Sequence, residues 1–246
     1  MASRLDRNLV VETALRLLNE VGLDGLTLRR IAKELNVQAP ALYWHFKNKQ
    51  ALLDEMATEM FRRMTDPLTG PRTVPSDLGD TWQEMLGLTC SALRRGLLGY
   101  RDGGKVFSGT RMTDESYAGP LDLMMRRLTT SGFGVGEAAH AWWTAYNFTI
   151  GLVIEEQSIY PEPGKPETRD PAYDVEDREQ RLGVSYPLAA LAGREMFGDL
   201  DRSFEAGMRI VIAGIEATKG REEATMGREG AAMGREEAIK GRAEGS

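Results

Sequence analysis

The chain has 246 residues, of which 41% are apolar, and its 31 Lys and Arg against 37 Asp and Glu leave a formal net charge of −6. A lone cysteine, Cys90, excludes an intrachain disulfide scaffold. The most apolar run, residues 138–154, is shorter than the ~20 residues that a membrane span needs, and no signal peptide is evident. We therefore expect a cytoplasmic protein without a membrane partner.

The charge is unevenly distributed along the chain. Residues 1–50 carry a net charge of +3, and the other 196 residues carry −9. A basic head on an acidic body is typical of a nucleic-acid-binding module, although a chance fluctuation of a few charges gives the same pattern. If the chain binds nucleic acid, we expect the binding motif within residues 1–50.

Four helices are predicted in the first 65 residues. The first has an apolar stripe from Val10 to Val21 and stops at Gly22. A short second helix spans 28–35, with Thr27 placed to cap it. After a turn at 36–37, a third helix of about seven residues begins near Pro40 and runs to about His45. A fourth helix covers 49–64.

The third helix has the composition of a DNA-reading element. Tyr43, Trp44 and His45 cluster on it, and Lys47 and Lys49 follow. Aromatic and small side chains can contact thymine methyl groups and sugars, while Lys and His reach phosphates. Two short helices joined by a tight turn indicate a helix-turn-helix whose second helix reads the major groove. The alternative is that Tyr43 and Trp44 pack against the first helix.

The rest of the chain is predicted to be helical near 80–98, 101–108, 114–130, 135–157, 187–197 and 199–218, so the fold class is all-α. Prolines predict a linker at 65–80 and a long mobile loop at 158–187. Because 135–157 is apolar almost all round, it must be buried on more than one side. We expect this helix and 199–218 to form a subunit interface; the alternative is burial within one domain. From Lys219 a degenerate seven-residue repeat predicts a frayed helix or a disordered tail.

Several stretches make the chain resemble the TetR family of repressors, and within it the tetracycline-responsive members. These are LNEVGLDGLTLRRIAKELNV, APALYWHFKNKQALLDEMA, YRDGGKV, GTR, NFTIG and EEQ, spread over roughly residues 4–218. The resemblance implies a helix-turn-helix DNA-binding domain with a linking helix (1–66) and a ligand-binding and dimerisation domain (67–218). The tail at 219–246 has no counterpart. It also implies a homodimer on a palindromic DNA operator, with reading helices ~34–36 Å apart.

The resemblance assigns DNA contacts by position. Arg29, which could read guanine, matches the family pattern together with Thr27, Pro40, Tyr43, Trp44, His45 and Lys49. Ala39 and Ala41 depart from it, because the tetracycline-responsive members have a Gln and a Thr there. We therefore expect altered readout at about one base pair in each half-site.

The effector pocket departs further from that pattern. Thr110, Arg111 and Glu155 keep the residue type, whereas Phe107 stands in place of the histidine that holds magnesium. The other departing positions are Thr65, Thr89, Leu93, Leu123 and Asn147. Phenylalanine cannot bind a metal, so we expect no metal, no cofactor and an apolar small-molecule effector, polycyclic aromatic or polyketide-like. The alternatives are a magnesium–tetracycline effector and a cavity that the larger side chains fill.

These observations predict a ligand-responsive repressor that controls an exporter or resistance gene. An enzyme using the same cavity is the rival, but the histidine-poor chain shows no general base or nucleophile motif around Cys90, and Glu155-Glu156 is interpreted as a charged break at the surface. An architectural DNA binder would need positive charge beyond residue 50. GFGVG at 132–136 follows no predicted strand and is therefore interpreted as a turn between helices.

Overall fold

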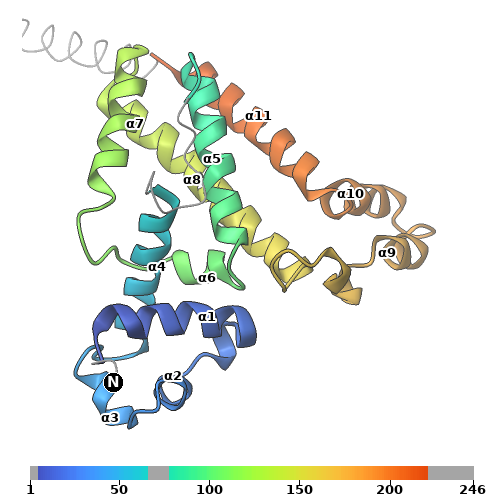
Figure 1. Ribbon diagram of the computed structural model, residues 1–246. Coiled ribbons are helices and arrows are strands. Elements are labelled where there is room, and N and C mark those ends of the chain that lie inside the picture. Colours follow the sequence, from blue (N-terminus) through green and yellow to red (C-terminus); the bar gives the residue numbers. More distant parts are fainter. Residues whose placement is uncertain (1–4, 66–77, 221–246) are drawn as a thin grey trace, which may run out of the picture.

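The computed structural model describes residues 5–65 and 78–220, and within these ranges every regular element is a helix. The prediction of an all-α fold is confirmed. Figure 1 shows a small head made of α1–α3, a connecting helix α4, a body of α5–α8 with α11, and an arm carrying α9 and α10. Among the described residues no helix is long and apolar enough to cross a membrane. Most of the predicted 65–80 linker and the tail from 221 lie outside the described residues.

The helices have the following bounds: α1 Arg7–Gly25, α2 Leu28–Glu34, α3 Ala39–Tyr43, α4 Lys49–Thr65, α5 Trp82–Leu98, α6 Gly103–Phe107, α7 Ala118–Thr130, α8 Val135–Ile159, α9 Val175–Leu182, α10 Pro187–Phe197 and α11 Leu200–Thr218. Two 3-10 turns, Pro166–Thr168 and Pro171–Tyr173, lie between α8 and α9. Most predicted segments match these helices within a few residues.

The third helix is shorter than predicted, because α3 ends at Tyr43 and Trp44 is its C-cap. The predicted 101–108 and 114–130 segments begin later, at Gly103 and Ala118. The prediction of a long mobile loop at 158–187 is wrong. Prolines begin the two 3-10 turns instead of ending structure, and the Asp174 carboxylate caps α9 by accepting the N–H of Asp177 at 2.9 Å.

Local signals explain the helix-turn-helix in the head. The Thr27 hydroxyl accepts the Arg30 N–H at 3.2 Å and starts α2. Asn36 has a φ of 52°, a left-handed conformation that asparagine tolerates, and so turns the chain between α2 and α3. The buried side chains of Ile31 and Leu42 hold the two helices together beneath α1. This packing leaves the outer surface of α3 facing away from the molecule.

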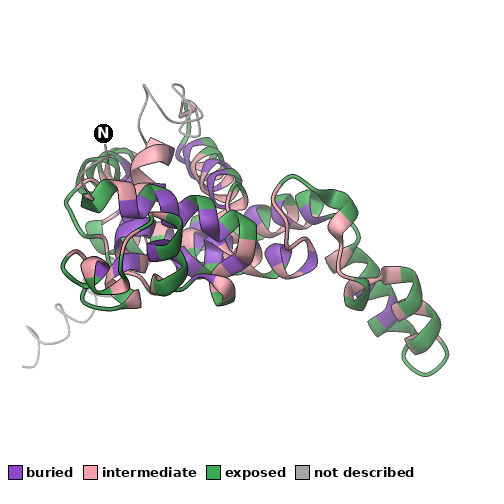
Figure 2. Cartoon of the chain, turned by 60° about the horizontal axis from the view of Figure 1, so that its bottom comes forward, coloured by how far each residue is buried: buried purple, intermediate pink, exposed green. Residues whose placement is uncertain are grey.

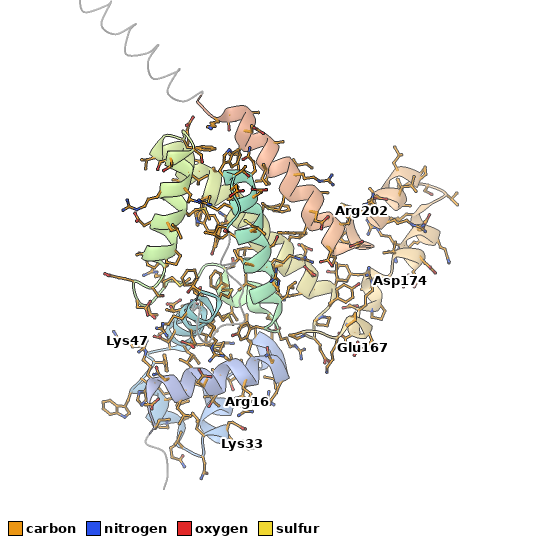
Figure 3. The ribbon with its side chains drawn as sticks, turned by 45° about the horizontal axis from the view of Figure 1, so that its top comes forward. Arg16, Lys33, Lys47, Glu167, Asp174 and Arg202 are labelled. Atoms are coloured by element: carbon orange, nitrogen blue, oxygen red, sulfur yellow. The ribbon has the colours of Figure 1, made fainter. Side chains whose placement is uncertain are left out.

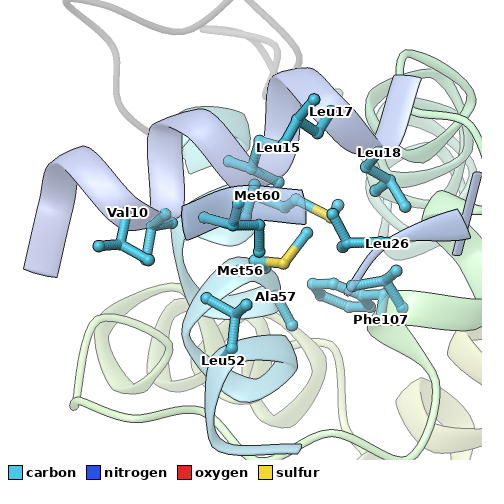
Figure 4. Close-up of a cluster of buried hydrophobic side chains, with 14 of the residues drawn as sticks. Val10, Leu15, Leu17, Leu18, Leu26, Leu52, Met56, Ala57, Met60 and Phe107 are labelled. Atoms are coloured by element: carbon cyan, nitrogen blue, oxygen red, sulfur yellow. The ribbon is translucent and has the colours of Figure 1, made fainter. Parts of the chain in front are cut away.

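One hydrophobic cluster joins the head to the body (Figure 4). Val10 and Leu18 of α1, Met60 of α4 and Phe107 of α6 all belong to it, and each is at most 3% exposed. At its far end the cluster includes Val153 of α8. Helix α4 is therefore part of the core of both units.

The body has a second cluster between α5, α7, α8 and α11. The Trp82 and Phe133 rings meet edge to face, with centroids 5.1 Å apart. Gly207 lets α11 approach α8, because a Cβ there would lie 2.2 Å from Cζ of Phe148. At Gly214, further along α11, an added Cβ would meet no atom of the described residues within 4 Å.

Helix α8 is less enclosed than its composition predicts. Its buried side, which includes Ala138, Ala145 and Val153, packs on the body, but a stripe along it stays exposed. That exposed side carries the small residues Ala139, Thr144 and Gly151, and also the larger His140, Trp143, Asn147 and Glu155. Figure 2 shows that the arm is exposed over most of its surface as well. The apolar sequence of α8 therefore overstates its burial within one chain.

Polar contacts add a second connection between head and body, at the end of α1. The Asp102 carboxylate accepts the Leu23 N–H at 2.9 Å, and the Asn19 side-chain oxygen accepts the Arg101 N–H at 2.9 Å. Gly22 makes this approach feasible: its φ is 70°, and a Cβ there would lie 3.0 Å from Asp102 and Arg101 side-chain atoms. These two hydrogen bonds hold the turn between α5 and α6 against the head.

The contact of α11 with α8 predicts a stability difference between two glycine variants. Gly207→Val should lower the free energy of unfolding by about 1–3 kcal/mol, because Phe148, stacked on Phe204, must move. Gly87→Ala, in open space on α5, should raise it by up to ~1 kcal/mol through helix propensity. Urea unfolding at one fixed protein concentration measures both values. An unchanged urea midpoint for Gly207→Val would contradict this prediction, because it would show that the contact of α11 with α8 accepts the larger side chain without loss of stability.

Candidate functional sites

The head ends in two exposed aromatic side chains. Trp44 is 90% exposed and Tyr43 is 55% exposed, whereas Phe46, two residues further on, is 1% exposed. The alternative that Tyr43 and Trp44 pack on α1 is therefore wrong. Exposing an indole to water is unfavourable, and an exposed aromatic pair at a protein surface indicates a binding surface.

The other candidate DNA-binding residues of the sequence lie on the same part of the head. Thr27, Arg29 and Pro40 are exposed, and Ala39 and Ala41 are partly buried on α3. Lys33 and Lys47 are also exposed, at the end of the molecule opposite α11 (Figure 3). The cations and the aromatic pair form a surface that can meet a phosphate backbone.

Two of the candidate DNA-binding residues, His45 and Lys49, also form hydrogen bonds with α1. The His45 carbonyl accepts from the Arg7 guanidinium at 3.1 Å, and the Lys49 ammonium donates to the Leu23 carbonyl at 2.9 Å. Both side chains are partly buried. The Lys49 bond is the second to this carbonyl at the end of α1, which also accepts the Leu26 N–H at 3.3 Å.

Two of the residues predicted to bind the effector, Phe107 and Leu93, are apolar and lie in or against the core. Phe107 is 3% exposed, and Leu93 of α5 packs against the same cluster. Tyr146 of α8 lies with its ring centroid 6.4 Å from that of Phe107. Trp143, which is 61% exposed, stacks on Tyr146 at 5.4 Å with an interplanar angle of 12°. These rings extend from the core to the surface.

Tyr146 and Trp143 were not assigned to the site from the sequence. Their i, i+3 spacing on α8 was the signal that could have paired them. Burial raises the pKa of the Tyr146 hydroxyl above its ordinary value, so the group stays neutral and can donate a hydrogen bond to a ligand. The ring system is thus an apolar surface with two polar groups, the Tyr146 hydroxyl and the Trp143 indole N–H.

The outer candidates do not converge on that aromatic group in the single chain. Leu123 of α7 is 49% exposed. Asn147 is exposed and donates from Nδ2 to the Trp143 carbonyl at 2.7 Å. Glu155 and Arg111 are exposed too. The structure therefore separates the predicted set into a buried apolar part and a surface part.

Three hydroxyls complete the candidate set. Thr65 donates to the Phe61 carbonyl at 2.9 Å, and Thr110 donates to the Phe107 carbonyl at 2.9 Å. The Thr89 hydroxyl oxygen on α5 is buried without a hydrogen-bond partner among the described residues. A buried hydroxyl without a partner costs free energy, and a ligand atom could satisfy it.

The residues at these positions do not fit a magnesium chelate. Phe107 offers no donor atom, and Glu155 faces solvent, whereas magnesium takes carboxylate or carbonyl oxygens. Among residues 5–65 and 78–220, no group of three or more His, Cys, Asp or Glu side chains is placed to hold a metal ion.

Two other reactive candidates have structural explanations. Burial raises the pKa of the Cys90 thiol to about 11, so it is not an activated nucleophile. Glu156 is not the surface break expected from the sequence: it is 9% exposed and forms a bidentate ion pair with Arg94, with both distances 2.8 Å. Gly132, at the GFGVG motif, has a φ of 87° and turns the chain between α7 and α8, as predicted.

Two cavities lie away from the aromatic group. The first, of about 280 Å³, is lined by Tyr100, Tyr160 and the 161–166 segment at the end of α8. The second, of about 460 Å³, lies between Gly79, which precedes α5, and Leu88 of α5. Neither contains a predicted effector residue. In this structure the side chains around Phe107 are packed together, in keeping with the alternative that larger residues fill this region.

Comparisons with known proteins cover nearly the whole described chain. A family model described as "Bacterial regulatory proteins, tetR family" matches residues 10–56, and one described as "Tetracyclin repressor-like, C-terminal domain" matches residues 74–219. The tetracycline repressor protein class C of Escherichia coli is 36% identical over 216 residues, which are 87% of this chain and 92% of that protein.

Solved structures agree with these matches. A TetR variant from Acinetobacter baumannii AYE in complex with minocycline is 33% identical with a TM-score of 0.63, over 88% of this chain and 99% of that one. ActR from Streptomyces coelicolor in complex with actinorhodin is 26% identical with a TM-score of 0.72, over 89% and 100%.

The contrast between Trp44 and Phe46 predicts different effects on stability. Phe46→Ala should lower the free energy of unfolding by about 3–5 kcal/mol, because it leaves a cavity beneath α1 and removes the ring that the Arg7 guanidinium covers at 4.6 Å. Trp44→Ala should change it by no more than ~0.5 kcal/mol. Calorimetric unfolding of both variants tests this, and a large loss for Trp44→Ala would show a structural role for that indole.

Proposed function

The chain belongs to the TetR family of transcriptional repressors, and from that premise we propose that it binds a palindromic operator as a homodimer and is released by an apolar effector held without a metal. The observation that carries the proposal is the exposed Trp44 and Tyr43 at the end of the reading helix. In this proposal residues 1–66 bind DNA, residues 67–218 bind ligand and dimerise, and the protein acts in the cytoplasm.

The proposed dimer joins two copies through α8 and α11. Besides the exposed small residues of α8, α11 presents Ile210, which is 74% exposed, in line with Ala213, Gly214 and Ala217. An apolar stripe of small residues allows close helix packing, and burying it in a second copy removes it from water. Gly214, where an added Cβ would meet no atom of the described residues within 4 Å, is then used in the interface.

For DNA, the proposed contacts are Arg29 and the α3 residues in the major groove, with phosphates contacted around them. The full set is Thr27, Arg29, Ala39, Pro40, Ala41, Tyr43, Trp44, His45 and Lys49. The alanine methyl groups can contact thymine but cannot hydrogen-bond to a base edge. The operator should therefore be related to those of tetracycline repressors without being identical.

For the effector, we propose a planar polycyclic molecule seated on the Trp143–Tyr146 rings and reaching towards Phe107. The full proposed set is Thr65, Thr89, Leu93, Phe107, Thr110, Arg111, Leu123, Asn147 and Glu155, together with Trp143 and Tyr146. The complex of ActR with actinorhodin supports an actinorhodin-like ligand, and the expectation that no metal is needed rests on Phe107. Because the region around Phe107 is packed in this structure, the ligand-bound state must open it, and a ligand does so only if it binds that state more tightly.

A route from effector to DNA follows from the contacts of α6. Phe107 ends α6, and Asp102 at its start accepts the Leu23 N–H of α1. Displacing α6 therefore pulls on the head through a hydrogen bond that Gly22 allows. Two heads moved in this way no longer match successive major grooves. The proposed target gene encodes an exporter or a resistance protein.

Two other functions are weaker. Magnesium–tetracycline binding is favoured by the identity to tetracycline repressors, but Phe107 removes the metal ligand. An enzyme in the same cavity would need an activated group. Buried Cys90, with its raised pKa, does not provide one.

Operator binding is tested by selecting DNA from a random library. The wild-type protein should enrich a palindrome, and Trp44→Ala should weaken binding to it by about tenfold or more. Glu34→Gln is the control: it breaks the exposed ion pair with Arg16 (Figure 3) outside the proposed DNA-binding set, and should bind as the wild type does. Enrichment of no palindrome would contradict the proposal.

Calorimetry separates the effector classes. Actinorhodin should bind with a Kd that magnesium chloride does not change, and tetracycline should show no magnesium-dependent binding. Trp143→Ala should weaken actinorhodin binding by about threefold to tenfold through the loss of one stacking contact. Val184→Ala on the arm, where Val184 is 96% exposed, is the control. Tight tetracycline binding that requires magnesium would overturn the metal-free proposal.

A further inference from the structure

A buried carboxylate lies at the junction of α1 and α4. Glu55 is 8% exposed, and both of its oxygens are used. Arg7 donates to Oε2 from Nη2 at 2.6 Å and from Nε at 2.9 Å, and Arg62 donates to Oε1 at 3.0 Å. Burial raises the pKa of the Glu55 carboxyl, but the two guanidinium groups outweigh it, and the pKa lies below its ordinary value. The group is therefore a charged partner of both arginines.

Arg7 connects this carboxylate to the end of the reading helix. Its Nη1 donates to the His45 carbonyl at 3.1 Å, and its guanidinium lies 4.6 Å from the centre of the Phe46 ring. His45 and Phe46 directly follow Trp44, the C-cap of α3. The position of Arg7 thus determines where the chain leaves α3.

Arg62 connects the same carboxylate to the body. It donates to Asp114 from Nε at 2.9 Å and from Nη2 at 2.7 Å, and to Glu59 at 2.8 Å. Asp114 belongs to the segment between α6 and α7, where the Thr113 N–H also donates to the Thr58 hydroxyl at 2.9 Å. This segment also carries Thr110 and Arg111, part of the proposed effector region.

The four side chains therefore form one series of ion pairs from the body to the reading helix: Asp114, Arg62, Glu55 and Arg7. Isolated surface pairs contribute little. This series differs because its central carboxylate is buried and because the arginine at either end donates two N–H groups, from Nε and Nη2, to one carboxylate oxygen. None of these residues belongs to the DNA-binding or effector sets.

We propose that the series Asp114–Arg62–Glu55–Arg7, ending on the His45 carbonyl, holds the reading helix at a fixed angle to the body and so sets the half-site spacing that the dimer accepts. The proposal rests on the function proposed above. The four residues are positioning residues. Because each head is held to its own body, a dimer with rigid heads presents its two reading helices at one separation only.

The test uses the operator obtained by selection and versions with two base pairs inserted or removed between the half-sites. Fluorescence anisotropy gives the Kd of each for the wild-type protein and for Asp114→Asn. The wild type should prefer the selected spacing strongly. Asp114→Asn should bind that operator less well and the altered ones equally well or better, so that the preference falls about tenfold.

Three further variants make the result specific. Asp114→Glu keeps the charge and should restore the preference. Glu34→Gln breaks an exposed pair inside the head and should leave it unchanged. Glu55→Gln should lower it as Asp114→Asn does. If that variant fails to fold, Asp114→Asn still decides the matter, because Asp114 is exposed and circular dichroism can confirm its fold.

The outcomes separate the two proposals. Failure to enrich any palindrome would overturn the repressor function, and this inference with it. Enrichment of a palindrome, with the same spacing preference in the wild type and Asp114→Asn, would overturn the inference alone. A wild-type protein that binds operators of altered half-site spacing equally well would also overturn the inference.

Discussion

The arrangement of the molecule depends on one hydrophobic core that the head and the body share through α4. Met56 and Met60 of α4 are fully buried, with α1 on one side and α6 on the other. Burying one such side chain contributes roughly 1.5–3 kcal/mol. Separating the head from α4 would expose several of them at once, so the head follows the movement of α4.

Polar contacts then determine the direction of such a movement. At one place Asp102 holds the end of α1, and at another Asp114 reaches the reading helix through Arg62, Glu55 and Arg7. Both carboxylates lie on segments adjoining α6, which carries Phe107. In the proposed mechanism, a ligand that shifts α6 acts on the head through these contacts by a rigid rotation, a common form of allosteric change.

Local signals predicted much of this structure. The apolar stripe of α1 and the cap at Thr27 located the first two helices, and both are found. The errors arose where local pattern and packing disagree. The end of α3 was placed two residues late because Trp44 and His45 suit a helix, and α9 was missed because prolines precede it. Helix α8 is a different case: it was expected to contribute to a subunit interface, and one chain covers only part of it. The sequence left open whether the region around Phe107 is packed, since composition does not reveal whether larger side chains line a cavity or fill it.

By itself, the sequence determined the fold class, the helix-turn-helix and the absence of a metal-binding side chain at Phe107, because these follow from periodicity, capping and residue type. Only the tertiary structure decided that Trp44 faces solvent while Phe46 is buried, and that Trp143 stacks on Tyr146. It also decided that Glu55 meets Arg7, 48 residues away, and that Arg62 meets Asp114, 52 residues away. Such pairs depend on how helices pack, and helical periodicity defines the faces of a helix without defining which distant face will meet them.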